Sequence, residues 1–119
     1  MKRIMVIDDA ESMRQILTIT LKRKGYQVID AENGLVALEK LQNEKIDLFI
    51  CDVNMPKMNG LEFLEKLRTE GDHRDTPCIM LTTEVAEDLK EKGRELGSNG
   101  WIVKPFEPED FLNKVKEFL

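Results

Sequence analysis

Short apolar runs alternate with longer amphipathic stretches along the whole chain. Several of the runs are apolar at every position, which is typical of strands in a parallel sheet covered by helices on both faces. The pattern predicts strands near residues 4–7, 26–30, 47–51, 78–82 and 100–103.

The stretches between these strands have helical spacing. Met13, Ile16, Leu17 and Leu21 recur at helical intervals, and Gly25 follows as the glycine that often ends a helix. Four more helices are expected after Asn33-Gly34, after Asn59-Gly60, over about 86–96, and after Pro108. The helix over 86–96 has few apolar anchors, which indicates either a helix that moves or a solvent-exposed helix that does not. Five strand–helix units with short connections predict an α/β fold, a doubly wound five-stranded parallel sheet.

Length, charge and hydropathy narrow the classes of function. The 119 residues suit one domain, and we expect a single domain over residues 1–119 with no appended output domain. The net charge of −5 argues against direct nucleic-acid binding. No apolar run approaches the roughly 18 residues of a membrane span, and the apolar run after Met1-Lys2-Arg3 is too short for a signal peptide. We therefore expect a cytoplasmic protein without a membrane partner.

The cysteines and the only histidine are expected to have no chemical role. Aligning the predicted strand ends staggers Cys51 and Cys78 by about three residues on opposite faces of the sheet, too far apart for a disulfide. Both are interpreted as small buried hydrophobic residues in a reducing compartment. His73 lies in the polar segment 70–77, which is expected to be a surface turn with an exposed, unimportant histidine.

Polar residues end or directly follow four of the five predicted strands. Ligands of open parallel sheets bind beyond the carboxyl ends of the strands, where strand order reverses. Carboxylates crowded at this edge require a cation, and a site of oxygen ligands without His or Cys suits Mg²⁺. The residues concerned are Asp8 and Asp9, Asp52, Thr82 and Lys104.

A lysine and a threonine at the same edge supply a charge and a hydroxyl for a phosphoryl group. Asp52 could then accept that group as an aspartyl phosphate. Taken singly, these residues have simpler explanations. Asp8 and Asp9 could cap the first helix, Thr82 with Thr83 could cap the fourth, and Lys104-Pro105 could form a turn. Their joint occurrence at one sheet edge favours the chemical interpretation.

Together these motifs resemble the receiver domain of two-component response regulators over the whole chain. The resemblance implies a flavodoxin-like fold with strand order 2-1-3-4-5 and a cis Lys104–Pro105 bond. It implies that Asp52 is the phosphoacceptor, that Lys104 contacts the phosphoryl group and that Thr82 binds it through its hydroxyl. It further implies Mg²⁺ held by Asp8, Asp9, Asp52 and the backbone carbonyl of Asn54. The motifs are Asp8-Asp9, Asp52-Val53-Asn54-Met55-Pro56 with Gly60, Thr82, and Lys104-Pro105-Phe106.

Two positions depart from the pattern of this family. Thr83 stands where many relatives have Ala or Gly, which would narrow access to the phosphorylation site. Trp101 replaces the usual Tyr or Phe of the rotating switch, so the indole either packs outward permanently or is a partly buried anchor. Phosphorylation is expected to change a face made by the fourth helix, the fifth strand and the fifth helix. The residues expected on this output surface are Val85, Lys90, Trp101 and Lys114.

The resemblance implies a monomer that signals by protein contact. A histidine kinase of the chemotaxis type would donate the phosphoryl group. A flagellar motor switch protein or another downstream protein would be the target, and a phosphatase would be a further partner. Its only catalysis would be its own phosphorylation and dephosphorylation. A single-domain phosphorelay intermediate is the alternative. Two alternatives come from other classes of protein. A haloacid-dehalogenase-like, Mg²⁺-dependent phosphatase would need an Asp-x-Asp motif where this chain has Asp8-Asp9. A flavodoxin-like redox protein would need a phosphate-binding loop where this chain has Ala10-Glu11-Ser12-Met13.

Overall fold

The computed structural model describes residues 1–119 and contains one parallel sheet of five strands. Their order across the sheet is β2-β1-β3-β4-β5, as the resemblance implied. The outer position of β2 places the reversal of strand order between β1 and β3. The strands are β1 (Arg3–Ile7), β2 (Gln27–Ala31), β3 (Leu48–Cys51), β4 (Cys78–Thr82) and β5 (Gly100–Val103).

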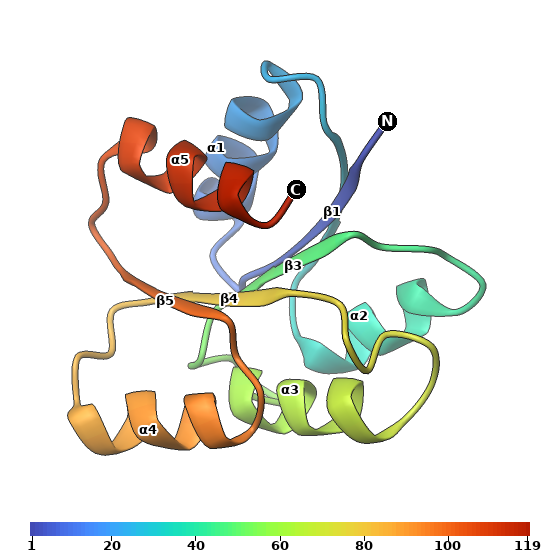
Figure 1. The fold of residues 1–119 in the computed structure, drawn as a ribbon, viewed down its shortest axis with the longest axis vertical. Coiled ribbons are helices and arrows are strands. Elements are labelled where there is room, and N and C mark those ends of the chain that lie inside the picture. Colours follow the sequence, from blue (N-terminus) through green and yellow to red (C-terminus); the bar gives the residue numbers. More distant parts are fainter.

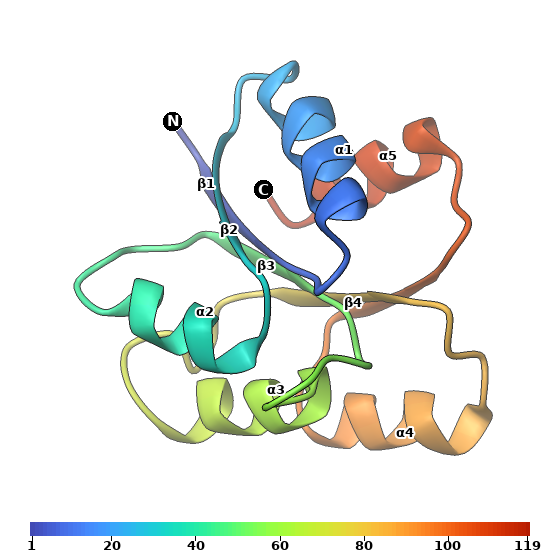
Figure 2. The same ribbon diagram turned by 180° about the vertical axis from the view of Figure 1, so that it is seen from behind.

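Five helices cover the two faces of this sheet. Figures 1 and 2 show α1 and α5 on one face and α2, α3 and α4 on the other. None of the helices combines the length and apolar character that a bilayer crossing requires. The helices are α1 (Glu11–Lys22), α2 (Gly34–Leu41), α3 (Gly60–Thr69), α4 (Glu87–Glu95) and α5 (Pro108–Glu117).

The core is divided by the sheet into two apolar clusters. Successive strand residues point to opposite faces, so Met5 and Ile7 pack toward α2 and α3, while Ile4 and Val6 pack toward α1 and α5. All four are buried. Because both faces are covered, the central strands β1, β3 and β4 are apolar along nearly their whole length, which explains the pattern seen in the sequence.

Helix starts follow local signals where the sequence offers a capping side chain. The Asn33 side chain accepts the N–H of Val36 at the start of α2. Asn59 and Glu62 form a reciprocal capping box at the start of α3. Gly25, at φ +91°, provides the left-handed residue after α1. These short-range devices explain why helix positions could be predicted from the sequence.

The register of β3 and β4 corrects the expectation for the cysteines. Cys51 pairs with Met80 and Cys78 with Phe49, so the offset is two residues and both thiols lie on the α2–α3 face. The predicted stagger of three and the opposite faces were wrong because β4 extends one residue further toward the carboxyl edge than β3. Both cysteines are free and buried. Burial raises the pKa of both thiols, that of Cys78 to about 12. Both cysteines therefore stay protonated at neutral pH.

His73 was also predicted wrongly. Its side chain is buried, with a relative exposure of 8%, and Nε2 accepts the backbone N–H of Ile46 at 3.1 Å. The ring lies edge-on to Phe49, with centroids 5.4 Å apart. His73 thereby joins the α3–β4 loop to the α2–β3 loop, a contact between distant segments that no local pattern reveals.

Candidate functional site

Three carboxylates meet at the carboxyl edge of the sheet, where the strand order reverses. Asp8 and Asp9 follow β1, and Asp52 follows the neighbouring strand β3. One carboxylate oxygen of each lies within 4.8 Å of the other two. Asp8 and Asp52 are buried, whereas Asp9 is exposed to solvent. The predicted convergence of these residues is therefore present in the structure.

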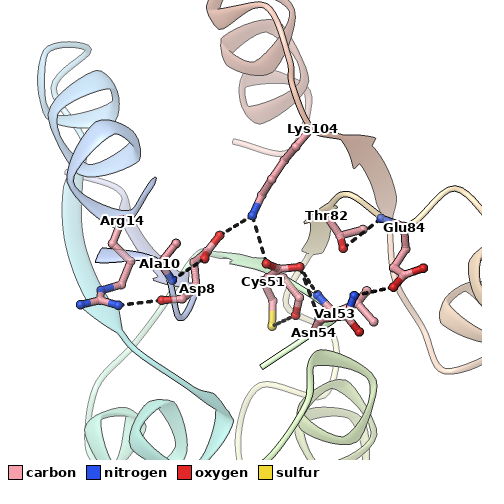
Figure 3. A network of polar contacts seen from close by, with 10 residues as sticks. Asp8, Ala10, Arg14, Cys51, Val53, Asn54, Thr82, Glu84 and Lys104 are labelled. Carbon is pink, nitrogen blue, oxygen red and sulfur yellow. Dashed lines mark hydrogen bonds and ion pairs between the residues drawn. The ribbon is translucent and has the colours of Figure 1, made fainter. Parts of the chain in front are cut away.

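Lys104 brings a positive charge to this cluster. It follows β5, and its Nζ donates to Asp8 Oδ2 at 2.6 Å and to Asp52 Oδ2 at 3.0 Å (Figure 3). Burial of the ammonium by itself lowers its pKa, but hydrogen bonds to Asp8 and Asp52 and their negative charges act in the opposite direction. The pKa of Lys104 is raised overall, so the side chain remains charged at neutral pH.

The acidic side chains are not used to cap helices. The N-cap of α1 is Ala10, and no side chain caps this helix. Asp8 Oδ1 accepts the N–H of Ala10 at 2.9 Å, and the Asp9 carboxylate accepts no hydrogen bond. Asp52 Oδ1 accepts the N–H of Val53 at 2.7 Å. The helix-capping explanation of Asp8 and Asp9 is therefore excluded.

The donor set fits Mg²⁺. The cluster offers only oxygen ligands, which hard divalent cations prefer, and Asp9 provides a carboxylate open to solvent. The backbone carbonyl of Asn54, in the loop after β3, accepts no hydrogen bond from the protein. Asp8, Asp9, Asp52 and this carbonyl are the residues that would hold the ion.

Thr82 lies at the end of β4, and its side chain is fully buried. Its hydroxyl accepts the backbone N–H of Glu84 at 3.3 Å, and it makes no hydrogen bond to Asp8, Asp52 or Lys104. Its backbone carbonyl accepts the N–H of Lys104 at 2.9 Å. Thr82 does not cap α4, whose N-cap is Ala86 without a side-chain cap. The residue is thus placed at the site edge, joined to it through the main chain.

Sequence reasoning missed Glu84 as a connecting residue. Its carboxylate accepts a hydrogen bond from Nδ2 of Asn54, and its backbone carbonyl accepts the indole N–H of Trp101 at 3.0 Å. Glu84 therefore connects the loop after Asp52 with β5. Its place two residues beyond Thr82, in the loop at the same sheet edge, was the signal available in the sequence.

Arg14 was also missed. Figure 3 shows its guanidinium directed at the backbone of Asp8, to which Nη1 donates at 2.8 Å. Nε donates to Asp30 at 3.0 Å. A basic residue early in the helix that follows two aspartates was the only sequence signal.

Gly60 allows α3 to approach the site closely. A Cβ added at this position would lie 1.9 Å from the carbonyl oxygen of Asp52, well inside van der Waals contact. The Gly60 N–H donates to Val53 at 2.8 Å. Only glycine therefore permits this seating of the helix behind the phosphoacceptor candidate.

The residues predicted for the output surface come from the elements expected. Val85 precedes α4 and is 65% exposed, Lys90 lies on α4, and Lys114 lies on α5. Trp101 on β5 is half-buried and packs against the α2–α3–α4 side of the core, where a Cβ on Gly93 would meet its ring at 2.9 Å. Of the two expectations for Trp101, the structure has the partly buried anchor.

The cis Lys104–Pro105 bond is present as well.

The comparisons with known proteins agree with this geometry. The family model of the response regulator receiver domain matches residues 4–116, and the chain belongs to this family. It is a receiver domain of the type found in two-component signalling.

Its relatives include chemotaxis proteins. The chain is 40% identical to a chemotaxis protein CheY homolog of Campylobacter jejuni over 119 residues, which cover 98% of this chain and 92% of the relative. A crystal structure of chemotaxis protein CheY4 of Vibrio cholerae superposes with a TM-score of 0.95 at 41% identity, covering 100% of this chain and 99% of that one. Response regulator TrrA of Thermotoga maritima, solved in complex with Mg²⁺ and BeF, has a TM-score of 0.88 at 34% identity, with both chains fully covered.

Proposed function

We propose that this protein is a phosphorylation-dependent response regulator that receives a phosphoryl group on Asp52 from a histidine kinase. The observation that carries the proposal is the meeting of Asp8, Asp9 and Asp52 at one sheet edge, with Lys104 bonded to two of them. The Mg²⁺-containing complex of TrrA supports the assignment of Mg²⁺ as the metal.

In the reaction, an Asp52 carboxylate oxygen attacks the phosphorus of a phosphohistidine. The phosphorus–oxygen bond forms, the phosphorus–nitrogen bond breaks, and the imidazole leaves and takes a proton from solvent. When bound, Mg²⁺ neutralises charge on the transferring group. Lys104 pairs with a phosphoryl oxygen in place of the Asp52 oxygen that it now contacts. The Thr82 hydroxyl turns from the Glu84 N–H to donate to another phosphoryl oxygen.

The phosphoryl group acts on the output surface through these two residues. Movement of Thr82 releases the Glu84 N–H, and Glu84 holds Trp101 through its carbonyl. New charge-assisted hydrogen bonds of about 1.5–3 kcal/mol each are of the order needed to shift a two-state equilibrium. The receiver domain would signal as a monomer, through contacts of the surface that includes Val85, Lys90, Trp101 and Lys114.

We further propose that this signalling belongs to cytoplasmic chemotaxis. The supporting observation is the similarity, over nearly the full length of both chains, to chemotaxis proteins. A chemotaxis kinase would then be the donor and the flagellar motor switch the target, with a phosphatase as a further partner.

The test is intact-protein mass spectrometry after incubation with acetyl phosphate and Mg²⁺. One added phosphoryl group is expected, absent in Asp52→Asn and retained in Asp47→Asn, a matched aspartate that precedes β3 at the opposite sheet edge. Equal phosphorylation of Asp52→Asn would refute the phosphoacceptor assignment. A parent that instead hydrolyses free phosphate esters continuously would be a phosphatase.

A binding experiment tests the partner. Purified flagellar switch protein should bind the phosphorylated form more tightly than the unphosphorylated form, and Val85→Asp should abolish the difference. If phosphorylated protein transfers its group to a histidine phosphotransfer domain and ignores the switch protein, the phosphorelay role is correct.

A further inference from the structure

Arg14 links the first two strands behind the carboxylate cluster. The residue lies early in α1, and only 16% of its side chain is exposed. Nε donates to Asp30 Oδ2 of β2 at 3.0 Å, and Nη1 donates to the backbone carbonyl of Asp8 at 2.8 Å. The guanidinium thus connects a side chain of β2 to the main chain just after β1. Figure 3 shows the contact with Asp8.

The position is unusual on electrostatic grounds. A cation close to a helix N-terminus opposes the helix dipole, and a cation beside metal-binding carboxylates competes with the metal. The positive charge of Arg14 therefore disfavours Mg²⁺ binding, and any benefit of the residue to the site must come from its hydrogen bonds. A planar guanidinium does offer several donors in fixed directions, which can hold two acceptors in a defined arrangement.

Both backbone groups of Asp8 and both of its carboxylate oxygens make hydrogen bonds within the protein. Its N–H donates to Ala31 of β2 at 3.1 Å, and its Oδ1 accepts the N–H of Ala10. Arg14 occupies the remaining backbone group, the carbonyl, which joins Asp8 to Asp9. The orientation of the peptide between the two aspartates therefore depends on the Arg14 hydrogen bond.

We propose that Arg14 is a positioning residue of the metal site, with Asp30 as its anchor. It fixes the Asp8–Asp9 peptide so that both carboxylates are directed toward the ion. The proposal rests on the proposed function, because it assumes that Mg²⁺ binds at Asp8, Asp9 and Asp52. It adds a role for Arg14 and Asp30, neither of which would touch the metal.

The substitution Arg14→Gln separates positioning from charge. Removal of a cation near the carboxylates would by Coulomb attraction alone strengthen Mg²⁺ binding. Loss of positioning weakens it, by about tenfold, the lower end of the effect of removing hydrogen bonds that orient metal ligands. The two explanations therefore predict changes of opposite sign in the Mg²⁺ dissociation constant.

The measurement is isothermal titration calorimetry of Mg²⁺ into the full chain, with circular dichroism to confirm folding. Arg94→Gln is the matched control, because Arg94 is exposed on α4 and pairs only with Glu91 of the same helix. We expect weaker Mg²⁺ binding in Arg14→Gln and parent-like binding in Arg94→Gln. Binding in Arg14→Gln that equals or exceeds that of the parent would overturn the proposal.

The anchor gives a second test that does not depend on the folding of Arg14→Gln. Asp30→Asn keeps an oxygen that can accept from Nε, whereas Asp30→Ala does not, and both remove the same charge. Positioning predicts that Mg²⁺ binding weakens several-fold in Asp30→Ala and is restored toward the parent in Asp30→Asn. Equal affinities in the two variants would refute it.

The failure of the metal site itself would be recognised separately. If the parent binds no Mg²⁺, or if Asp9→Asn binds it as tightly as the parent, the proposed function fails whatever Arg14 does. If Asp9→Asn weakens Mg²⁺ binding but the Arg14 and Asp30 variants bind Mg²⁺ as tightly as the parent, the proposed function stands and the positioning role is wrong.

Discussion

The Lys104 ammonium lies 2.6 Å from Oδ2 of Asp8, although 96 positions separate the two residues in the sequence. The same nitrogen contacts Asp52. Lys104 is therefore the cation that the chain itself supplies to its acidic edge. It also ties β5, at one side of the sheet, to β1 and β3 in the middle. We therefore expect the stability of the fold to respond to what binds at the site.

Replacing Lys104 with Met should make the fold depend on added metal. Without the ammonium, Asp8 and Asp52 are buried carboxylates without a counter-charge, which should lower the free energy of unfolding by about 3 kcal/mol. Under the proposed function, bound Mg²⁺ would replace the lost charge, so it should raise the melting temperature of Lys104→Met more than that of the parent. Thermal unfolding with EDTA and with Mg²⁺ measures both. Equal shifts in parent and variant would contradict this account.

His73 should make the stability depend on pH. Burial lowers its pKa more than the nearby charges of Asp72 and Asp47 raise it. Protonation of Nε2 would also remove the acceptor of the Ile46 N–H. The unfolded chain then binds a proton more readily, so the stabilising effect is complete above about pH 6.5 and is lost as pH falls through the folded-state pKa. Urea unfolding at pH 7.5 and 5.5 should show a smaller loss in His73→Gln, whose side-chain oxygen accepts without titrating. An identical loss in parent and variant would exclude His73 as the cause.

Gly60 should tolerate no side chain. In Gly60→Ala the Cβ would overlap the Asp52 carbonyl, so α3 or the Asp52 main chain must shift. We expect a loss of about 3 kcal/mol in the free energy of unfolding and slower phosphorylation by acetyl phosphate. Gly100→Ala is the control, since its Cβ would meet Ile79 at an ordinary 3.6 Å. Comparable destabilisation of both variants would argue against a specific clash.

Gly93 and Trp101 should show energetic coupling. Alanine is favoured over glycine inside a helix by about 1 kcal/mol, but a Cβ on Gly93 would meet the indole at 2.9 Å. Gly93→Ala should therefore stabilise the protein in a Trp101→Phe background and not in the parent. A double-mutant cycle from urea unfolding measures the difference. Additive effects would show that the indole does not restrict α4.

The strands and the reactive edge were predictable because their signals are local. Each strand is a short apolar run, and each site residue lies at or just beyond the end of one, so a parallel sheet brings Asp8, Asp52 and Lys104 to the same edge. The strand order that makes β1 and β3 neighbours came from the family resemblance. The capping residues Asn33 and Asn59 likewise act within one helical turn.

The errors and omissions concern contacts between distant segments. The polar surroundings of His73 in the sequence predicted exposure, but the loop folds back so that its ring meets Ile46 and Phe49. The cysteine register depended on where β3 and β4 end relative to each other. Arg14 donates to the backbone carbonyl of Asp8, and the backbone carbonyl of Glu84 accepts the indole N–H of Trp101, so the acceptor in both contacts is a group that every residue type has.

The sequence alone determined the fold class, the residues of the acidic edge and their resemblance to the receiver family, because these depend on periodicity and on residues adjacent to strand ends. Tertiary structure decided how the side chains use their hydrogen-bonding capacity. It set Lys104 against Asp8, turned Trp101 inward onto Glu84, and placed Arg14 behind the two aspartates. Hydrogen bonds require donor and acceptor within about 3 Å and well aligned, a condition that only packing of the whole chain can satisfy.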